Sequence, residues 1–132
     1  MEEPVRAFLE NHHSAAIATL KADGAPHVAR VGIALMGDVL WSSGTRNRVR
    51  TRNLRRDPRA TLFVFDPRQA QSWMGVESHV RILDGPDAPE LNLRLYRALA
   101  AEPDDVEEYL AAMVHEERLI YEFTIDRTYG QY

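Results

Sequence analysis

Residues 15–35 read AAIATLKADGAPHVARVGIAL, and this stretch decides the fold. An apolar run at 15–20 is followed by Asp23-Gly24 and then by a second strand-like run at 27–35. Asp-Gly between two such runs predicts a β-hairpin, because both turn residues must tolerate positive φ. Pro26 stands at the entrance of the second strand, where its missing N–H is tolerated. The chain therefore begins its sheet with an antiparallel pair.

The remainder of the chain continues with short strands, now interrupted by helices. Apolar runs predict four more strands, at residues 39–43, 60–66, 72–83 and 119–125. Helical spacing of apolar residues predicts helices at 4–11 and around the stripes at 91–99 and 106–114. Six strands in meander order predict a mainly β fold with helices, a small closed or partly closed antiparallel barrel, because closure manages exposed strand edges. We expect one domain over residues 1–132.

The segment from Arg46 to Arg59 carries a sharp reversal of charge. It holds seven arginines and one acid, Asp57, whereas the whole chain has a net charge of −4. Crowded like charges destabilise a compact state, and guanidinium groups at a helix start are donors suited to a phosphate. The segment predicts an anion-binding helix that Asp57-Pro58 terminates. A solvated cationic helix, paired with the acidic remainder of the surface, is the alternative interpretation.

Several chemistries lack their motifs in this sequence. The chain has no cysteine, which excludes disulfides, thiolate nucleophiles and Cys-ligated metals. No two of its five histidines have the two-, three- or four-residue spacing of a shared metal, so we expect no metal site. Neither a Rossmann fingerprint nor a P-loop is present. We find no paired acid and base, and the catalytic residues stay unknown at this stage.

Composition is that of an ordinary globular protein, with 45% hydrophobic and 27% charged residues. The start Met1-Glu2-Glu3 does not resemble a signal peptide, and no apolar run approaches the roughly 20 residues of a membrane span. We therefore expect a cytoplasmic protein with no membrane partner. Nucleic acid is an unfavourable partner, because the pI is about 5.7 and no aromatic residue interleaves with the arginines.

The order of short motifs along the chain resembles a known family. The motifs are Ala18-Thr19-Leu20, Asp23-Gly24-Ala25-Pro26-His27-Val28, Leu40-Trp41-Ser42-Ser43, RTRNLRRDPRA at 50–60, Val76-Glu77-Ser78, Arg118-Leu119-Ile120 and Asp126-Arg127-Thr128-Tyr129-Gly130. Together they resemble the flavin and deazaflavin oxidoreductases of the pyridoxamine 5′-phosphate oxidase-like split-barrel superfamily. Within it, the chain is most similar to small enzymes that use the deazaflavin coenzyme F420. The resemblance covers essentially the whole chain.

This resemblance implies a six-stranded antiparallel split β-barrel of the FMN-binding type. It also implies a homodimer with two equivalent cofactor sites along the subunit interface. The Arg-rich segment would be the phosphate cradle, with Arg50 at a position usually occupied by Lys; a guanidinium can grip a phosphate in bidentate fashion. The implied cofactor-binding residues are Arg50, Ser43, Thr45, Arg46, Arg48, Arg30 and Trp73.

Some of these positions have a second interpretation. Arg30 matches an arginine that oxidase-like members use on the flavin phosphate, but a strand arginine paired with an acid fits equally well. Trp73 is either a contact of the cofactor ring or a core or interface aromatic. Ser78 stands where the family has glycine, so it would narrow the site. Tyr129 and Tyr132 would reach the partner's site.

The function implied by the resemblance is a cofactor-dependent oxidoreductase, in which the protein supplies binding, orientation and electrostatics. The leading hypothesis is hydride transfer between F420 and an electron-poor small organic substrate, such as an enone, quinone, tetrapyrrole-like or nitro compound. The first alternative is an FMN-dependent oxidase or reductase of the same group. The second is a non-catalytic flavin or haem binding protein.

Overall fold

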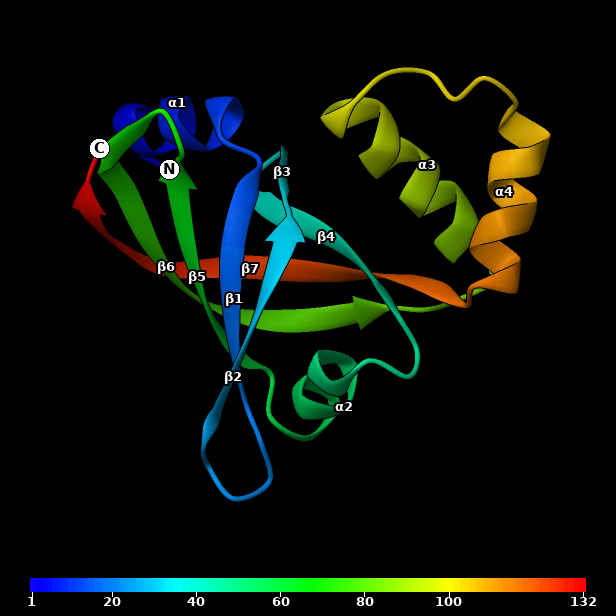
Figure 1. Cartoon of the computed structure of the whole chain (residues 1–132), viewed down its shortest axis with the longest axis horizontal. Helices are drawn as coiled ribbons and strands as arrows, with labels where there is room; N and C mark the ends of the chain where they lie inside the picture. Colours follow the sequence, from blue (N-terminus) through cyan, green and yellow to red (C-terminus); the bar gives the residue numbers. More distant parts are fainter.

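The computed structural model in Figure 1 describes residues 1–132, apart from the side chain of Ala70. Seven strands form one antiparallel sheet in the order β2-β1-β5-β6-β7-β4-β3. The strands are β1 (Ser14–Leu20), β2 (Pro26–Gly32), β3 (Ala34–Met36), β4 (Val39–Thr45), β5 (Arg59–Asp66), β6 (Gln69–Leu83) and β7 (Arg118–Gln131). The helices are α1 (Glu3–Asn11), α2 (Val49–Arg56), α3 (Ala88–Leu99) and α4 (Val106–His115).

The hairpin predicted from Asp23-Gly24 is confirmed. Strands β1 and β2 pair in antiparallel register from Ser14 opposite Gly32 to Leu20 opposite Pro26. Gly24 has φ +86°, while the Asp23 carboxylate accepts the Ala25 N–H at 3.0 Å. Only the glycine takes the left-handed conformation, so the expectation that both turn residues need positive φ is wrong for Asp23.

The single strand predicted over residues 27–35 is two strands, so the sheet has seven strands instead of six. Strand β2 ends at Gly32, the side chain of Ile33 is fully buried, and its N–H bonds to the His13 carbonyl at 2.9 Å. The next strand, β3, pairs with β4 at the opposite edge of the sheet. Because one residue joins the two edge strands, the sheet must curl until its edges meet. This is the split barrel, with the split between β2 and β3.

The strand order also departs from the predicted meander. Strand β1 pairs with β5, and β4 pairs with β7, so in each of these two pairs the neighbouring strands are far apart in sequence. The helices interrupt the strands as expected, α2 between β4 and β5, and α3 with α4 between β6 and β7.

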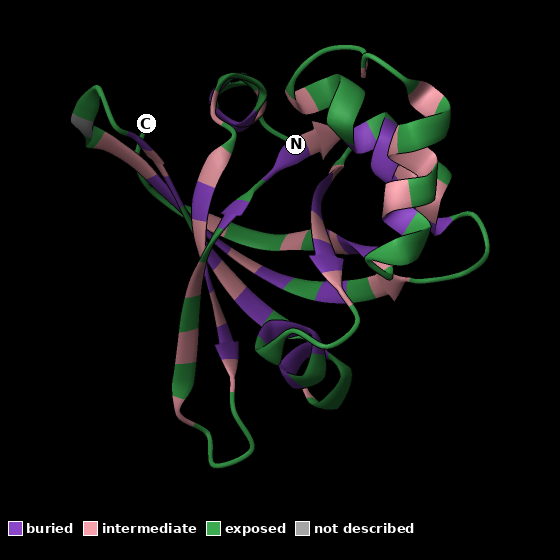
Figure 2. Cartoon of the chain, turned by 45° about the vertical axis from the view of Figure 1, so that its right-hand side comes forward, coloured by how far each residue is buried: buried purple, intermediate pink, exposed green. Residues whose placement is uncertain are grey.

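The inward face of the curled sheet forms the main core, and Figure 2 shows buried residues along the strands. Alternating residues of β1 and β5 point inward, and Ile17, Leu62, Tyr121 and Phe123 have no exposed surface. Helix α1 adds the buried side chains Val5, Phe8 and Leu9 to this core. Burial of such side chains stabilises the fold by about 1.5–3 kcal/mol each.

A smaller apolar cluster packs helix α3 onto the outside of the barrel. It joins Leu95 of α3 to Ala34, Trp41 and Ile120 of β3, β4 and β7. The sheet thus has α3 and α4 on its outer side near β4, and α2 near the opposite end of the barrel from α1 (Figure 1). In the part of the chain that the structure describes, no helix has both the length and the apolar character needed to cross a membrane.

Candidate functional site

Strand β4 and helix α2 are held together by Thr51. Its hydroxyl donates to the Thr45 carbonyl at 2.7 Å and makes a short hydrogen bond with the Tyr121 hydroxyl. The Tyr121 ring lies over Gly44, where a Cβ would overlap the ring and its hydroxyl. Asn53 donates to the Thr19 hydroxyl at 3.1 Å on the next turn of the helix. These contacts fix the N-terminal turn of α2 against the barrel.

Arg50 is the unusual member of this turn, because it is buried without an acidic partner. Arg50 is only 9% exposed, and its Cζ lies 5.7 Å from the centre of the Tyr121 ring. Its Nε has no hydrogen-bond partner among the described residues. A buried charge without a partner costs several kcal/mol. An anion bound at this turn would remove that cost.

The electrostatics of Arg50 agree with this interpretation. Burial lowers the pKa of Arg50 from its ordinary value, Tyr121 opposes that shift, and the positive charges of Arg48 and Arg118 lower the pKa further. Three guanidinium groups therefore share one neighbourhood. Arg48 is also the N-cap of α2 and makes no side-chain capping hydrogen bond, so this helix end has no capping side chain. A helix N-terminus favours negative charge.

The seven arginines of the segment divide into two groups. Ion pairs form between Arg46 and Glu117 at 3.4 Å, Arg55 and Asp84 at 2.8 Å, and Arg59 and Asp57 at 2.8 Å. The remaining four make no ion pair within the described part of the chain; they are Arg48, Arg50, Arg52 and Arg56. The surface ion-pair interpretation thus accounts for three arginines, and an anion site remains available to the others.

A recess of about 430 Å³ lies beside the α2 N-terminus. Residues from two segments far apart in sequence line it: Thr45, Arg46, Asn47 and Arg48 from the β4–α2 link, and His115, Glu116, Glu117 and Arg118 from the α4–β7 turn. The two segments lie side by side because Thr45 of β4 pairs directly with Arg118 of β7. The structure therefore brings together Thr45, Arg46 and Arg48, with Arg50 adjacent.

Ser43 lies apart from this group. Its hydroxyl donates to the Asn92 side chain at 2.5 Å, under helix α3. It lines a separate cavity of about 230 Å³ with Tyr109, Arg118 and apolar residues of α3 and α4. Burial raises the pKa of Tyr109, whose hydroxyl donates to the Asn92 carbonyl. Ser43 and Gly44 point to opposite faces of β4, so the Ser43 hydroxyl is turned away from Tyr121.

Arg30 and Trp73 lie on the outer face of the sheet, away from α2. The register places Arg30 beside Ala16, Ala16 beside Phe63, and Trp73 beside Phe65. Arg30 makes no ion pair among the described residues. The predicted cofactor residues therefore fall into an α2 group, an outer-face group and Ser43, and a single chain does not bring the three together.

Aromatic rings cover part of the outer face. Phe63 stacks on Phe65 and on Trp73 with ring centres 5.7 and 5.6 Å apart, and Trp73 meets Tyr129 edge-on at 6.1 Å. Phe63 is 45% and Tyr129 37% exposed. We call Phe63, Phe65, Trp73 and Tyr129 the aromatic face. A contiguous exposed apolar patch of this kind is typical of an interaction surface.

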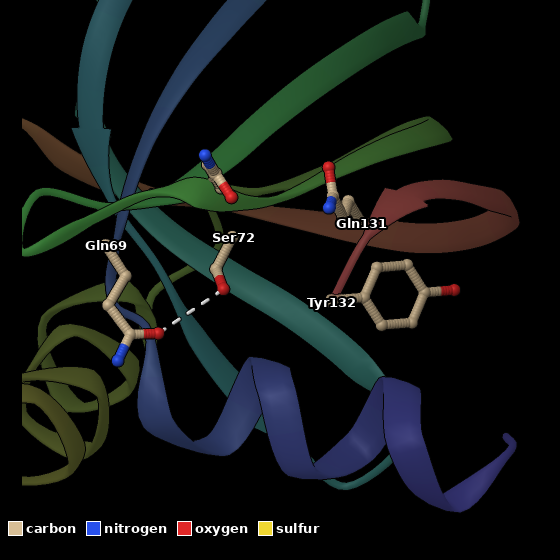
Figure 3. Close-up of a pocket in the computed structure, with 5 residues that line it drawn as sticks. Gln69, Ser72, Gln131 and Tyr132 are labelled. Carbon is tan, nitrogen blue, oxygen red and sulfur yellow. Dashed lines mark hydrogen bonds between the residues drawn. The ribbon is translucent and has the colours of Figure 1, made fainter.

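The opposite end of the barrel offers a different recess, shown in Figure 3. It has a volume of about 590 Å³ and is lined by Gln69, Gln71, Ser72, Gln131 and Tyr132. Ser72 donates weakly to Gln69 across it, at 3.5 Å. Its lining carries amides, a hydroxyl and a phenol but no charged side chain, so it lacks the guanidinium groups that gather at the α2 end.

Sequence reasoning missed two residues of the α2 site. Arg118 and Tyr121 are on β7, about seventy residues from α2, and no local pattern marks them as neighbours of Arg50. Ser78 is buried and donates to the Ala60 carbonyl at 2.7 Å, so its hydroxyl is engaged with the backbone. Among the described residues, no group of three His, Cys, Asp or Glu side chains is placed to hold a metal ion.

Comparison with known proteins identifies the family and the fold class of the chain. The family model for pyridoxamine 5′-phosphate oxidase matches residues 1–132, and the chain belongs to this family. Solved structures share the fold. An F420 reductase is 24% identical, with a TM-score of 0.75 over 99% of this chain and 100% of that one.

Two further structures are similar. A conserved hypothetical protein from Mycobacterium tuberculosis is 21% identical, with a TM-score of 0.77 over 97% of this chain and 82% of that one. A protein from Listeria innocua described as a putative pyridoxamine 5′-phosphate oxidase is 12% identical, with a TM-score of 0.72 over 96% and 94%. At these identities the structures demonstrate the shared split-barrel fold. The family match indicates an oxidoreductase with a flavin-type cofactor.

Proposed function

We propose that the protein is an F420-dependent oxidoreductase that transfers a hydride between this deazaflavin and an electron-poor small organic substrate. The observation that carries the proposal is the buried Arg50 at the N-terminus of α2, which has no acidic partner among the described residues and whose Nε has no hydrogen-bond partner there, with Arg48 and Arg118 beside it. The cofactor, when bound, supplies the hydride chemistry. The side chains of the chain bind and orient it.

The residues of the α2 site have separate tasks in this proposal. Arg50 holds the cofactor phosphate as its principal ligand, and Arg48 and Arg46 add charge-assisted hydrogen bonds at the rim. Thr45 supplies a hydroxyl from the end of β4. Arg118, which lines the same recess, joins this set. Because Arg50 is buried and packs against the Tyr121 ring, we expect little side-chain entropy to be lost when the phosphate binds.

The aromatic face supports a homodimer. Exposed Phe63 and Tyr129 and half-buried Phe65 and Trp73 would be covered by a second copy of this face, since a two-fold interface uses the same patch on both subunits. Arg30 stands at the edge of the same face by register. In the dimer, Arg30 and Trp73 would border a groove between subunits, where a ring attached to the bound phosphate can lie.

FMN is the second candidate cofactor, because the same cradle fits its phosphate and the family contains flavin-type oxidases. A side-by-side titration of the purified protein with FMN and with F420, followed by fluorescence, separates the two. The proposal expects tighter binding of F420. Tighter binding of FMN would instead indicate an FMN-dependent oxidase or reductase.

Turnover separates an enzyme from a carrier. Reduced F420 is mixed with the protein and a panel of enones, quinones and nitro compounds, and reoxidation of the cofactor is followed by absorbance. The proposal expects reoxidation that requires both protein and acceptor. Tight binding without reoxidation by any acceptor would favour the non-catalytic flavin or haem binding protein.

A further inference from the structure

The turn between α4 and β7 directs two consecutive carboxylates toward the arginines of the α2 recess. Glu116 Oε1 lies 2.9 Å from both Nε and Nη2 of Arg118. Glu117 Oε2 lies 3.4 Å from Nε of Arg46. The backbone of the turn is also tied to the β4–α2 link, because the Arg46 N–H donates to the Glu117 carbonyl at 3.2 Å.

Glu117 has an unusual backbone conformation. Its φ of +53° is in the left-handed region, and within the described residues it is the one non-glycine residue with positive φ. This conformation costs of order 1 kcal/mol or more for a residue with a Cβ. A glycine would adopt this conformation without strain. The glutamate at this position is therefore explained by its side chain and not by its backbone conformation.

The charges of the site are divided unevenly. Arg46 and Arg118 are each paired with one of the two carboxylates, whereas Arg48 and Arg50 have no acidic partner among the described residues. Four arginines and two carboxylates leave a formal charge of +2, which matches a phosphate dianion. If the carboxylates move away, all four guanidinium groups become available to the anion.

We propose that Glu116 and Glu117 form a counterion gate: they hold Arg118 and Arg46 until an anion arrives, and then release both arginines to a phosphate-bearing ligand. This rests on the proposed function and describes the regulation of the same site. Carboxylate and phosphate compete for the same guanidinium donors. Arg48 makes the first contact, because it lines the recess and no carboxylate has to leave it.

The exchange is physically easy. The side chains of Glu116 and Glu117 are 41% and 55% exposed, so both can turn into solvent. Exposed ion pairs are individually weak, and their loss is offset by stronger contacts with a multiply charged phosphate. The gate therefore lowers the affinity for anions without blocking the recess.

The test is calorimetric titration of the full chain with inorganic phosphate. Replacing Glu116 or Glu117 with Gln keeps the size of the side chain and removes its charge. We expect E116Q and E117Q each to tighten phosphate binding by about twofold to fivefold, the worth of one exposed ion pair. The matched control is E107Q, on the exposed surface of α4, which loses the same charge without releasing an arginine; we expect a change below about twofold.

A second variant separates release of an arginine from a general charge effect. In an R118Q background, E116Q has no arginine to release, so its gain in phosphate affinity should disappear. The gate is overturned if E116Q and E117Q bind phosphate no more tightly than E107Q, or if the gain from E116Q persists with R118Q. If the unaltered chain binds phosphate too weakly to measure, the E116Q/E117Q double variant must bind it measurably, and failure to do so also overturns the gate.

Failure of the gate and failure of the proposed phosphate site give different results. Phosphate binding that is lost in R50A while E116Q and E117Q behave like E107Q rejects the gate alone. Phosphate binding that is indifferent to R50A rejects the assigned phosphate site. Thermal unfolding of every variant shows whether it is folded before its titration is compared.

Discussion

A glycine-to-alanine change at Gly44 tests how β4 and Tyr121 shape the site. The Tyr121 side chain is fully buried, and an added Cβ at Gly44 would overlap both its ring and its hydroxyl. The ring cannot swing into solvent, so it must push into the core or displace β4. Inserting a methyl group into a well-packed core costs about 1–3 kcal/mol.

A second cost follows from the hydroxyl of Tyr121. If the ring shifts, the hydrogen bond between Tyr121 and Thr51 is lost, which adds about 0.5–1.5 kcal/mol. Together the two costs are about 1.5–4.5 kcal/mol. For a chain of 132 residues, an unfolding entropy of about 2.1 cal/mol/K per residue converts 3 kcal/mol into a fall in Tm of about 10 °C.

The assay is thermal and urea unfolding of Gly44→Ala beside Gly32→Ala. At Gly32 the nearest atoms to an added Cβ are 3.8 Å away, an ordinary contact, so we expect little change in stability. In a Tyr121→Leu background the extra cost of Gly44→Ala should shrink, because the two changes remove one shared contact. The reasoning is refuted if Gly44→Ala is as stable as Gly32→Ala, or if its cost is the same in both backgrounds.

Three other changes have definite expected outcomes. Hydrogen bonds from the Arg59 side chain and N–H lower the pKa of Asp57 to about 2. The stability that this lowered pKa supplies is present above about pH 4 and is lost as the pH falls toward 2. Urea unfolding should therefore find Asp57→Asn less stable than the unaltered chain at pH 7, and the difference should close as the pH falls. Asp104→Asn, which removes an exposed carboxyl elsewhere, should give no such trend. Phe63→Lys should weaken self-association measured by sedimentation, whereas Val114→Lys, at an exposed site on α4, should leave it unchanged. Equal self-association of the two variants would show that the aromatic face is not the dimer interface. Thr51→Val should lower the free energy of unfolding by about 1–3 kcal/mol, because the Thr45 carbonyl and the Tyr121 hydroxyl lose a partner, and an unchanged urea midpoint would contradict this account.

Local sequence signals predicted the elements well. Asp23-Gly24 marked the first hairpin, because a tight turn needs a residue that accepts positive φ, and Gly24 does so. Asp57-Pro58 marked the end of α2 for an equally local reason. The division of residues 27–35 was missed, because Ile33 continues the apolar pattern of the strand although its N–H bonds across to His13.

Long-range features of the site left no such signal. Arg118 meets Thr45 only because β4 pairs with β7, and that pairing depends on closure of the whole barrel. Ser43 and Thr45 share a face of β4, but the Ser43 hydroxyl bonds to Asn92 of α3, and the position of that helix over the strand was not visible in the sequence. The absence of an acid beside Arg50 is visible only in three dimensions, since composition alone offered ample carboxylates to pair with it.

The most direct test of the account compares the affinity of Arg50→Ala and Arg52→Ala for F420 and FMN by fluorescence titration. Both changes remove one positive charge from α2, but Arg50 is buried beside Tyr121 and Arg52 is exposed. The account predicts that Arg50→Ala weakens binding of the preferred cofactor by about 1.5–3 kcal/mol, roughly tenfold to more than a hundredfold, whereas Arg52→Ala has a much smaller effect. Equal affinities of the two variants for that cofactor would contradict it.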